Sequence, residues 1–385
     1  MSIYFDHAAT TPMVESSLLA LNKQIKKLGN ASSLHSAGRS VRKDLETARE
    51  ELAAAVDCDA SEVIFTATGT EANNLAIKGL YWQGINKNKK VIITSTFEHH
   101  AVMDPINWLT EHEGAQVIAI NVDRNGFIDL AQLLQEIEKH HDEISFISIM
   151  HSNNEVGTIQ DIAQVIKMAR DIPVHSDCVQ SFGKVDLSFK KLGLTAATIS
   201  AHKIGGPLGV AALILKKGLD IEPILHGGGQ ERDIRSGTFN TPGITAFAAA
   251  ATDAVENKKE RELKVRELKK ELIQTIKKNV SDIVVNADQE KSLPGICSIT
   301  FPKTNSEGLL LLLDDEGIAC STGSACSAGV QRPSHVLLAM GLSEDETTST
   351  LRFSLSYTNT INEIARLGSV ISSVVARAKN ASGKK

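Results

Sequence analysis

Between residues 63 and 215 the chain alternates short apolar runs with amphipathic stretches. The apolar runs cover residues 63–66, 91–94, 117–121, 144–150, 172–175, 196–200 and 208–215. The stretches near 70–84, 101–113, 129–140 and 160–170 carry apolar residues at helical spacing. This alternation predicts βαβ units, and so an α/β fold with a mostly parallel sheet sandwiched by helices. Functional residues are expected beyond the carboxyl ends of the strands, where ligands of such sheets gather.

The remaining sequence predicts a second, smaller α+β domain. Helical spacing appears around 14–28 and 40–56, and the final third suggests strands at 296–301 and 350–355 and helices at 306–316 and 360–378. No proline or glycine follows Gly243 until past residue 279, and charged residues crowd 256–271, which predicts one long, partly solvated helix joining two domains. A chain of 385 residues is long enough for two domains. We expect a large domain at 16–258 and a small domain formed by 1–15 and 259–385.

Charge and composition exclude several classes of protein. The net charge is −5, and the absence of a dense block of lysine and arginine argues against direct binding to nucleic acid. The longest apolar runs, 246–251 and 308–313, are too short for a membrane span, and the first residues do not resemble a signal peptide. Five cysteines without disulfide or zinc-site spacing suit a reducing compartment. These features predict a cytoplasmic protein with no membrane partner and no metal site.

A lysine at residue 203 follows one of the apolar runs and lies in the segment S-A-H-K-I-G-G-P. An amine there could form a Schiff base, while Ser200 and His202 could hold an anion. Pyridoxal phosphate needs both functions, together with a carboxylate that keeps its ring nitrogen protonated. Asp177 ends an upstream apolar run and could supply that carboxylate. Considered alone, Lys203 is more simply a solvated loop lysine, so the assignment depends on its neighbours.

Two further strand ends carry candidate ligand-binding residues. Gly69 and Thr70 open a helix after the run at 63–66, where exposed backbone N–H groups and the helix dipole suit a phosphate. Thr70 could equally be an ordinary helix N-cap. His99 follows the run at 91–94 and could stack on a flat cofactor ring and transfer protons. The simpler interpretation of His99 is a loop histidine with a satisfied hydrogen bond.

Amide and carboxylate side chains follow the next strands. Asn154 could hydrogen-bond a ligand oxygen or could serve only the turn in which it lies. Asp177 and Gln180 are three residues apart and could serve the pyridinium nitrogen and the phenolic oxygen of one ring. Asp177 could instead cap a helix.

Cys326 differs from the other cysteines because every residue beside it in S-A-C-S-A-G is small. Such a segment predicts a mobile loop, about residues 321–332, that leaves the thiol exposed. Cys58, Cys178, Cys297 and Cys320 are interpreted as buried small hydrophobic residues. A glycine-rich segment at 226–238 carries Thr238 and predicts either a flexible connection or a second anion-binding loop.

Together, these segments resemble the NifS/IscS-like pyridoxal-phosphate-dependent cysteine desulfurases, in the class V aminotransferase family with fold type I. The resemblance spans about residues 3–375 and rests on an ordered series of motifs: Y-F-D-H-A-A-T-T-P, G-T-E-A-N-N, E-H-H-A-V, H-S-N-N-E-V-G-T-I-Q, H-S-D-C-V-Q-S-F-G-K, S-A-H-K-I-G-G-P-L-G-V, G-G-G-Q-E-R-D-I-R-S-G-T and G-S-A-C-S. The last motif places the chain with the long-loop members of the group.

The resemblance implies a role for each candidate residue. Lys203 carries the cofactor, Asp177 pairs with its ring nitrogen, Gln180 contacts its phenolic oxygen and His99 stacks on its ring. The phosphate is held by Gly69, Thr70, Ser200 and His202, and Thr238 reaches the phosphate of the neighbouring subunit, which implies a homodimer. Asn154, also a cofactor contact, and Arg352 bind the substrate carboxylate, and Cys326 accepts the sulfur.

The implied reaction converts L-cysteine to L-alanine and leaves a persulfide on Cys326. The implied acceptor is another protein, an iron–sulfur scaffold or a tRNA thiolase, in iron–sulfur cluster assembly or tRNA thiolation. Three positions depart from the usual pattern of the family: His7, Thr68 and Ser356. The alternatives are a selenocysteine lyase, another class V aminotransferase-like enzyme, or a catalytically silent scaffold for sulfur transfer.

Overall fold

The computed structural model describes residues 3–323 and 333–382. The helices are α1 (Glu15–Gln24), α2 (Ser36–Val56), α3 (Gly69–Ile85), α4 (His100–Glu113), α5 (Leu130–His140), α6 (Ile162–Ala169), α7 (Phe189–Leu192), α8 (Thr241–Glu256), α9 (Lys258–Asn279), α10 (Ser306–Asp315), α11 (His335–Ala339), α12 (Glu344–Thr347) and α13 (Ile361–Ser382). The strands are β1 (Ile3–Tyr4), β2 (Val63–Thr66), β3 (Val91–Ser95), β4 (Gln116–Ile120), β5 (Ile144–Ser148), β6 (Val174–Asp177), β7 (Ala196–Ser200), β8 (Ala211–Leu215), β9 (Val284–Val285), β10 (Ile296–Thr300), β11 (Ile318–Ala319) and β12 (Thr350–Ser354).

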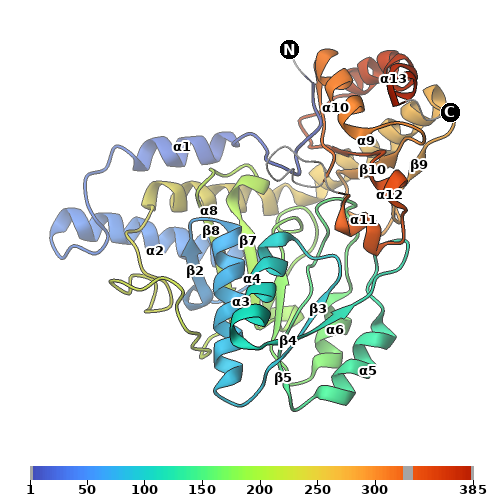
Figure 1. Cartoon of the computed structure of the whole chain (residues 1–385). Coiled ribbons are helices and arrows are strands. Elements are labelled where there is room, and N and C mark those ends of the chain that lie inside the picture. The colour runs from blue at the N-terminus through green and yellow to red at the C-terminus, as the bar shows by residue number, and fades with distance from the viewer. Residues whose placement is uncertain (1–2, 324–332, 383–385) are drawn as a thin grey trace.

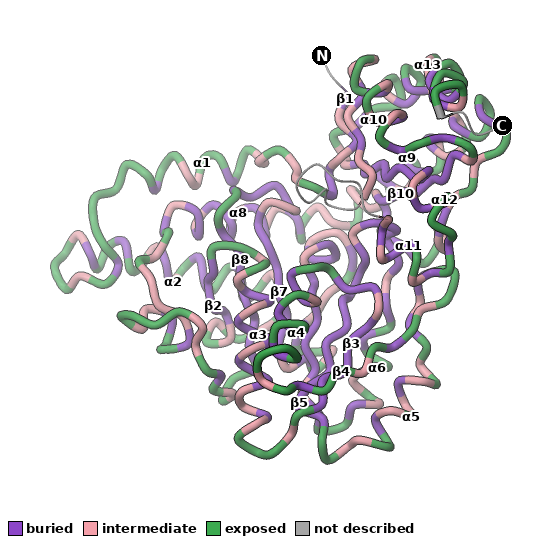
Figure 2. Tube along the Cα trace, in the orientation of Figure 1, coloured by how far each residue is buried: buried purple, intermediate pink, exposed green. Residues whose placement is uncertain are grey.

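Seven of the described strands form one sheet, in the order β2-β8-β7-β6-β5-β3-β4. Within this sheet only β8 runs in the direction opposite to the other strands, so the predicted mostly parallel sheet is confirmed. Side chains alternate between its two faces, because Val63 and Phe65 of β2 pack in the core cluster that holds α2 and α8, whereas Ile64 packs in the cluster that holds α3 and α4. Apart from the edge strand β4, which is largely exposed, the strands of this sheet are buried, while the outer faces of the flanking helices are exposed (Figure 2).

The C-terminal part of the chain has its own apolar core. Strand β10 lies between β9 and β12 in an antiparallel sheet, and α9, α10 and α13 contribute to the same cluster of buried residues. Strand β1 pairs with β11, so the N-terminal segment lies beside the C-terminal elements (Figure 1). The domain boundaries near residues 15 and 258 stay a prediction, which these separate clusters support.

The prediction of a single long helix over residues 241–279 is wrong. The chain forms α8 and α9 instead, and Asn257 between them adopts φ −97° and ψ 4°. The Asn257 side-chain amide donates to the carbonyl of Asp253 at 2.9 Å, a local bond that competes with helix continuation. Alanine-rich α8 packs into the core beside the large sheet, whereas α9 packs with the C-terminal elements. The break therefore lies where the chain passes from one core to the other.

A buried ion pair holds the glycine-rich segment at 226–238 against the rest of the predicted large domain. Arg49 of α2 donates to both carboxylate oxygens of Glu231, at 2.8 and 3.1 Å, and Glu231 is 1% exposed. Arg49 also donates to the carbonyl of Val63 and lies over the ring of Phe65. The segment is thus held against α2 and β2.

Replacing Glu231 with glutamine is expected to lower the free energy of unfolding by about 3 kcal/mol, because it leaves the Arg49 charge buried without its main partner. Urea unfolding followed by circular dichroism measures the change. The control is Asp44→Asn, which breaks the more exposed ion pair with Lys27 and should cost less than about 1 kcal/mol. Equal losses in the two variants would contradict the expectation.

No helix in the described ranges is both long enough and apolar enough to cross a lipid bilayer.

Candidate active site

A cleft of about 540 Å³ lies beyond the carboxyl ends of the central strands and beside the first turn of α3. The predicted site residues that line it are Gly69, Thr70, His99, Asn154, Asp177, Gln180, Ser200, His202, Lys203 and Arg352. Thr238 is absent from the cleft wall that the described residues form. Cys326 lies outside the described residues. The structure therefore brings together side chains that are almost 300 residues apart in the sequence.

Lys203 lies just after β7, and its Nζ donates to the carbonyls of Ala8 and Ala9, both at 2.7 Å. Burial lowers the pKa of Lys203 to about 8, and the nearby Arg352 acts in the same direction, against the opposing effect of Asp177. A lysine with such a pKa has a substantial neutral fraction near pH 8, and only the neutral amine can act as a nucleophile or accept a proton.

Asp177 ends β6 and is 6% exposed. Its Oδ2 accepts a hydrogen bond from Nδ2 of Asn73 at 2.7 Å, and its Oδ1 accepts from the backbone N–H of Val179 at 2.9 Å. The helix-cap interpretation of Asp177 is wrong, because the next helix, α7, is capped by Ser188. Both oxygens of the Asp177 side chain are therefore held by hydrogen bonds. Asn73, on α3, was not predicted as part of the site.

His99 is the N-cap of α4, and its Nδ1 accepts from the backbone N–H of Ala101 at 3.0 Å. Desolvation is the main cause that lowers the pKa of His99, opposed by the charge of Asp177. A neutral ring that accepts at Nδ1 carries its proton on Nε2, so the histidine keeps one donor. Both interpretations of His99 fit, since its capping bond is satisfied and the ring lines the cleft.

The first turn of α3 offers an anion site. Thr68, not Thr70, is the N-cap, because its hydroxyl accepts from the N–H of Glu71 at 3.0 Å. The backbone N–H groups of Gly69 and Thr70 find no acceptor among the described residues. A Cβ added at Gly69 would lie 3.2 Å from Cγ2 of Val179, so a side chain there would crowd the cradle. These features suit a phosphate group.

His202 adds a second observation at the same place. Its Nδ1 is buried and has no hydrogen-bond partner among the described residues. Burial, reinforced by the charge of Lys203, lowers the pKa of His202 to about 4, so the ring is neutral and one nitrogen carries a proton. A buried ring nitrogen without a partner is costly unless a ligand completes its hydrogen bonding.

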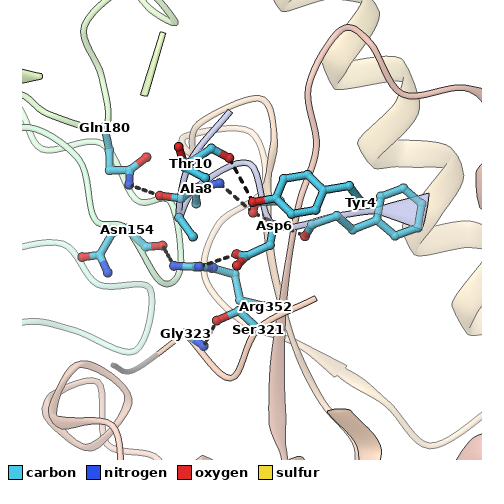
Figure 3. A network of polar contacts seen from close by, with 12 residues as sticks. Tyr4, Asp6, Ala8, Thr10, Asn154, Gln180, Ser321, Gly323 and Arg352 are labelled. Carbon is cyan, nitrogen blue, oxygen red and sulfur yellow. Dashed lines mark hydrogen bonds and ion pairs between the residues drawn. The ribbon is translucent and has the colours of Figure 1, made fainter. Parts of the chain in front are cut away.

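Arg352 lies on β12 and lines the same cleft as the phosphate cradle. Its guanidinium donates to Oδ1 of Asp6 at 2.6 Å and to the carbonyl of Asn154 at 2.9 Å (Figure 3). Its Nε is buried and has no partner among the described residues. The free Nε–H leaves a donor that a carboxylate could use. Asp6 was not predicted as a site residue, and Asn154 contributes its backbone carbonyl to this contact.

The loop that carries Thr238 reaches the phosphate cradle through another ion pair. Nε of Arg235 lies 2.7 Å from the carboxylate of Glu71, which is in the first turn of α3. The Glu71 charge would otherwise repel an anion at this helix terminus. Arg235 therefore neutralises the one carboxylate in that turn.

The four cysteines in the described part of the chain are poor nucleophiles. Cys178, Cys297 and Cys320 are buried as predicted, whereas Cys58 is only half-buried. Burial raises the pKa of Cys58 and Cys178 to about 12 and that of Cys297 to about 11, and it also raises the pKa of Cys320. None of these thiols would supply much thiolate near neutral pH.

Comparison with known proteins supports the family resemblance that the sequence motifs carry. The family model described as aminotransferase class-V matches residues 3–367. An IscS-like cysteine desulfurase of Mycobacterium tuberculosis is 44% identical, over 98% of this chain and 97% of its own. A solved NifS-like protein is 33% identical with a TM-score of 0.90, over 98% of this chain and all of its own. A solved SspA in complex with cysteine is 31% identical with a TM-score of 0.79, over 93% of this chain and all of its own.

The resemblance carried by the motifs and the expected fold class are thereby confirmed. The chain belongs to the class V aminotransferase family and, within it, to the IscS/NifS-like cysteine desulfurases.

Proposed function

We propose that this protein is a pyridoxal-phosphate-dependent cysteine desulfurase that acts on L-cysteine. The observation that most supports this proposal is that Lys203, Asp177 and His99 all line one cleft, beside a helix terminus suited to an anion. A lysine alone, or a phosphate cradle alone, would be compatible with many functions. A catalytically silent scaffold would have no need to keep this complete set of groups.

The residues present fit the cofactor. Gly69, Thr70, Ser200 and His202 would hold its phosphate, and the partnerless Nδ1 of His202 supports that role. Asp177 would pair with the ring nitrogen, Gln180 would contact the phenolic oxygen and His99 would cover one ring face. When bound, pyridoxal phosphate supplies an electron sink for the electron pair released at the substrate Cα.

The chain's own groups would perform the binding and proton transfer. Arg352 would take the substrate carboxylate through its unsatisfied Nε–H, with Asn154 beside it. The neutral amine of Lys203 would accept the Cα proton, because its lowered pKa keeps it partly unprotonated near pH 8. His99 retains a donor at Nε2 for a later proton transfer.

Cys326 is proposed as the sulfur acceptor. Its thiolate would attack the sulfur of the substrate, forming an S–S bond as the C–S bond breaks, so that L-cysteine and a thiol become L-alanine and a persulfide. The raised pKa values of the described cysteines support a different residue for this role. The outer sulfur of this persulfide would pass to an acceptor protein in the cytoplasm, an iron–sulfur scaffold or a tRNA thiolase.

We further propose that the active form is a homodimer in which Thr238 reaches the cofactor phosphate of the partner subunit. Thr238 is not part of the cleft wall formed by the described residues of its own chain. Large apolar side chains are exposed on α1 and in the segment that follows it, at Leu19, Ile25, Leu28 and Leu34. Exposed apolar side chains gathered in this way suit a protein interface. Light scattering should give twice the chain mass of 41.4 kDa.

The activity is tested by incubating the purified protein with L-cysteine and a reducing thiol, and by measuring alanine and sulfide together. Equal amounts of both products, with visible absorbance from a bound cofactor, are expected. Alanine formation that requires added pyruvate and is not accompanied by sulfide would instead indicate transamination. A strong preference for selenocysteine would indicate the lyase, and labelled sulfur followed onto co-purified proteins would identify the acceptor.

Replacing Arg352 with glutamine is expected to raise KM for L-cysteine about 10- to 100-fold, because the charge-assisted hydrogen bonds proposed between Arg352 and the substrate carboxylate are lost. Steady-state kinetics measure the change, and the melting temperature reports on loss of the Asp6 ion pair. Arg124→Gln is the control, since Arg124 pairs with Glu346 on the surface. An unchanged KM in Arg352→Gln would exclude Arg352 from substrate binding.

A further inference from the structure

The amide of Gln180 is held between two groups of opposite hydrogen-bonding character. Its Nε2 donates to the carbonyl of Ala8 at 2.9 Å, and its Oε1 accepts from Nζ of Lys184 at 3.0 Å. The carbonyl of Ala8 can only accept, and Nζ of Lys184 donates to Oε1 in this arrangement. A flipped amide would therefore set two acceptors face to face on one side and two donors on the other. The pair of contacts fixes one orientation of the side chain.

Of these two contacts, only the one to Lys184 is exclusive to Gln180. The carbonyl of Ala8 also accepts from Nζ of Lys203, so it is shared between two donors. Nζ of Lys184 finds no acceptor other than Gln180 among the described residues. Gln180 is 5% exposed and lines the cleft. Without Lys184, the amide would be held by a single shared contact.

Lys184 lies behind the cleft, at the wall of a smaller cavity of about 160 Å³. Ala8 and Lys203 line both spaces, so the two spaces adjoin at these residues. The other titratable side chains that line the smaller cavity are His7, Lys258, Arg261, Glu262 and Tyr357. Burial, together with the charges of Lys203 and Arg352, lowers the pKa of Lys184 to about 7. No carboxylate is among the causes that act on Lys184, and its contact is with a neutral amide.

We propose that Lys184 is a positioning residue that holds the Gln180 amide with its N–H group available to the cleft, so that Gln180 donates to the phenolic oxygen of the cofactor. This proposal rests on the proposed function, because it requires pyridoxal phosphate in the cleft. A donor to the phenolic oxygen stabilises the anionic form of that oxygen. Loss of the donor therefore favours the protonated form of the linked cofactor and raises the pH at which its visible absorbance changes.

The test is a spectroscopic pH titration of the cofactor-loaded protein without substrate. The midpoint of the visible absorbance change is expected to rise by about one pH unit in Lys184→Met, through loss of the oriented Gln180 donor. Lys184→Arg, which keeps both the charge and the donors, should stay within about 0.3 pH unit of the unmodified protein. The control is Lys258→Met, which removes a lysine from the same cavity wall that is paired with Asp186 and should leave the midpoint unchanged.

A double variant separates the action through Gln180 from a direct effect of charge. In a Gln180→Ala background, Lys184→Met should shift the midpoint by less than about 0.3 pH unit. An unchanged midpoint in Lys184→Met, or an equal shift with and without Gln180, would overturn the proposal. If Lys184→Met does not fold, Lys184→Gln is titrated in the same two backgrounds. An unmodified protein with no visible absorbance would instead overturn the proposed function.

Discussion

Lys203→Ala is expected to lower the rate of alanine formation from L-cysteine by at least about 10⁴-fold. The substitution would remove both the proposed covalent attachment of the cofactor and the amine proposed to take the Cα proton, and each such role is worth several orders of magnitude. The neighbouring carbonyls of Ala8 and Ala9 accept from Nζ and cannot replace it, because they have no proton-accepting nitrogen. The rate is measured by quantifying alanine with time.

A second readout identifies the linkage itself. Borohydride reduction followed by mass spectrometry should attach one cofactor mass to the peptide that contains Lys203 in the unmodified protein, and none in the variant. Lys216→Ala is the matched control, since Lys216 is an exposed lysine just after β8 and should leave rate and labelling unchanged. Labelling on another lysine of the unmodified protein would refute the assignment.

Cys326→Ala is expected to abolish persulfide formation while leaving the visible absorbance of the bound cofactor intact. The substitution removes the proposed sulfur acceptor and leaves the identity of every residue in the described cleft wall unchanged. Persulfide is measured by alkylation and mass spectrometry, and sulfide by its release on reduction. The expected loss is to the background of the assay.

The matched control for Cys326 is Cys58→Ser. Cys58 is the half-buried thiol among the described cysteines, and burial raises its pKa to about 12, so its loss should leave the rate unchanged. Normal sulfide release by Cys326→Ala would refute the role of Cys326. Loss of activity in Cys58→Ser with normal release in Cys326→Ala would identify the other thiol.

The local patterns were sufficient to predict most of the large sheet. Each apolar run between residues 63 and 215 overlaps a strand, because strands of a sheet that is covered on both faces are rich in apolar residues. The reversed direction of β8 could not be predicted, since direction depends on how the chain returns after Lys203 rather than on composition. The break at Asn257 was missed because one asparagine among helix-forming residues is a weak signal, and packing against two different cores decides its conformation.

The candidate site was predicted where a motif follows a strand, and it was missed where a residue acts through a distant partner. Asn73 is inside a helix, and its role appears only when Asp177, 104 residues away, lies against it. Asp6 similarly depends on Arg352, which no local pattern could pair with it. Thr68 is one of the positions that depart from the family pattern. It, and not Thr70, is the N-cap of α3, because its hydroxyl accepts from the N–H of Glu71, and the N–H of Thr70 stays available to a ligand. Asn73 could have been suspected because it lies one helical turn beyond the predicted phosphate cradle.

The bond between Asp6 and Arg352 joins positions that are 346 residues apart, and Ala8 and Ala9 hold Lys203 from the same N-terminal segment. During translation at roughly 5–20 residues per second, Asp6 leaves the ribosome well before Arg352 has been synthesised. Much of the large sheet can assemble in that interval, because its strands end at Leu215. The cleft wall is complete only when the late strand β12 is in place, so the cleft cannot bind a ligand in its final form before residue 354 has been synthesised.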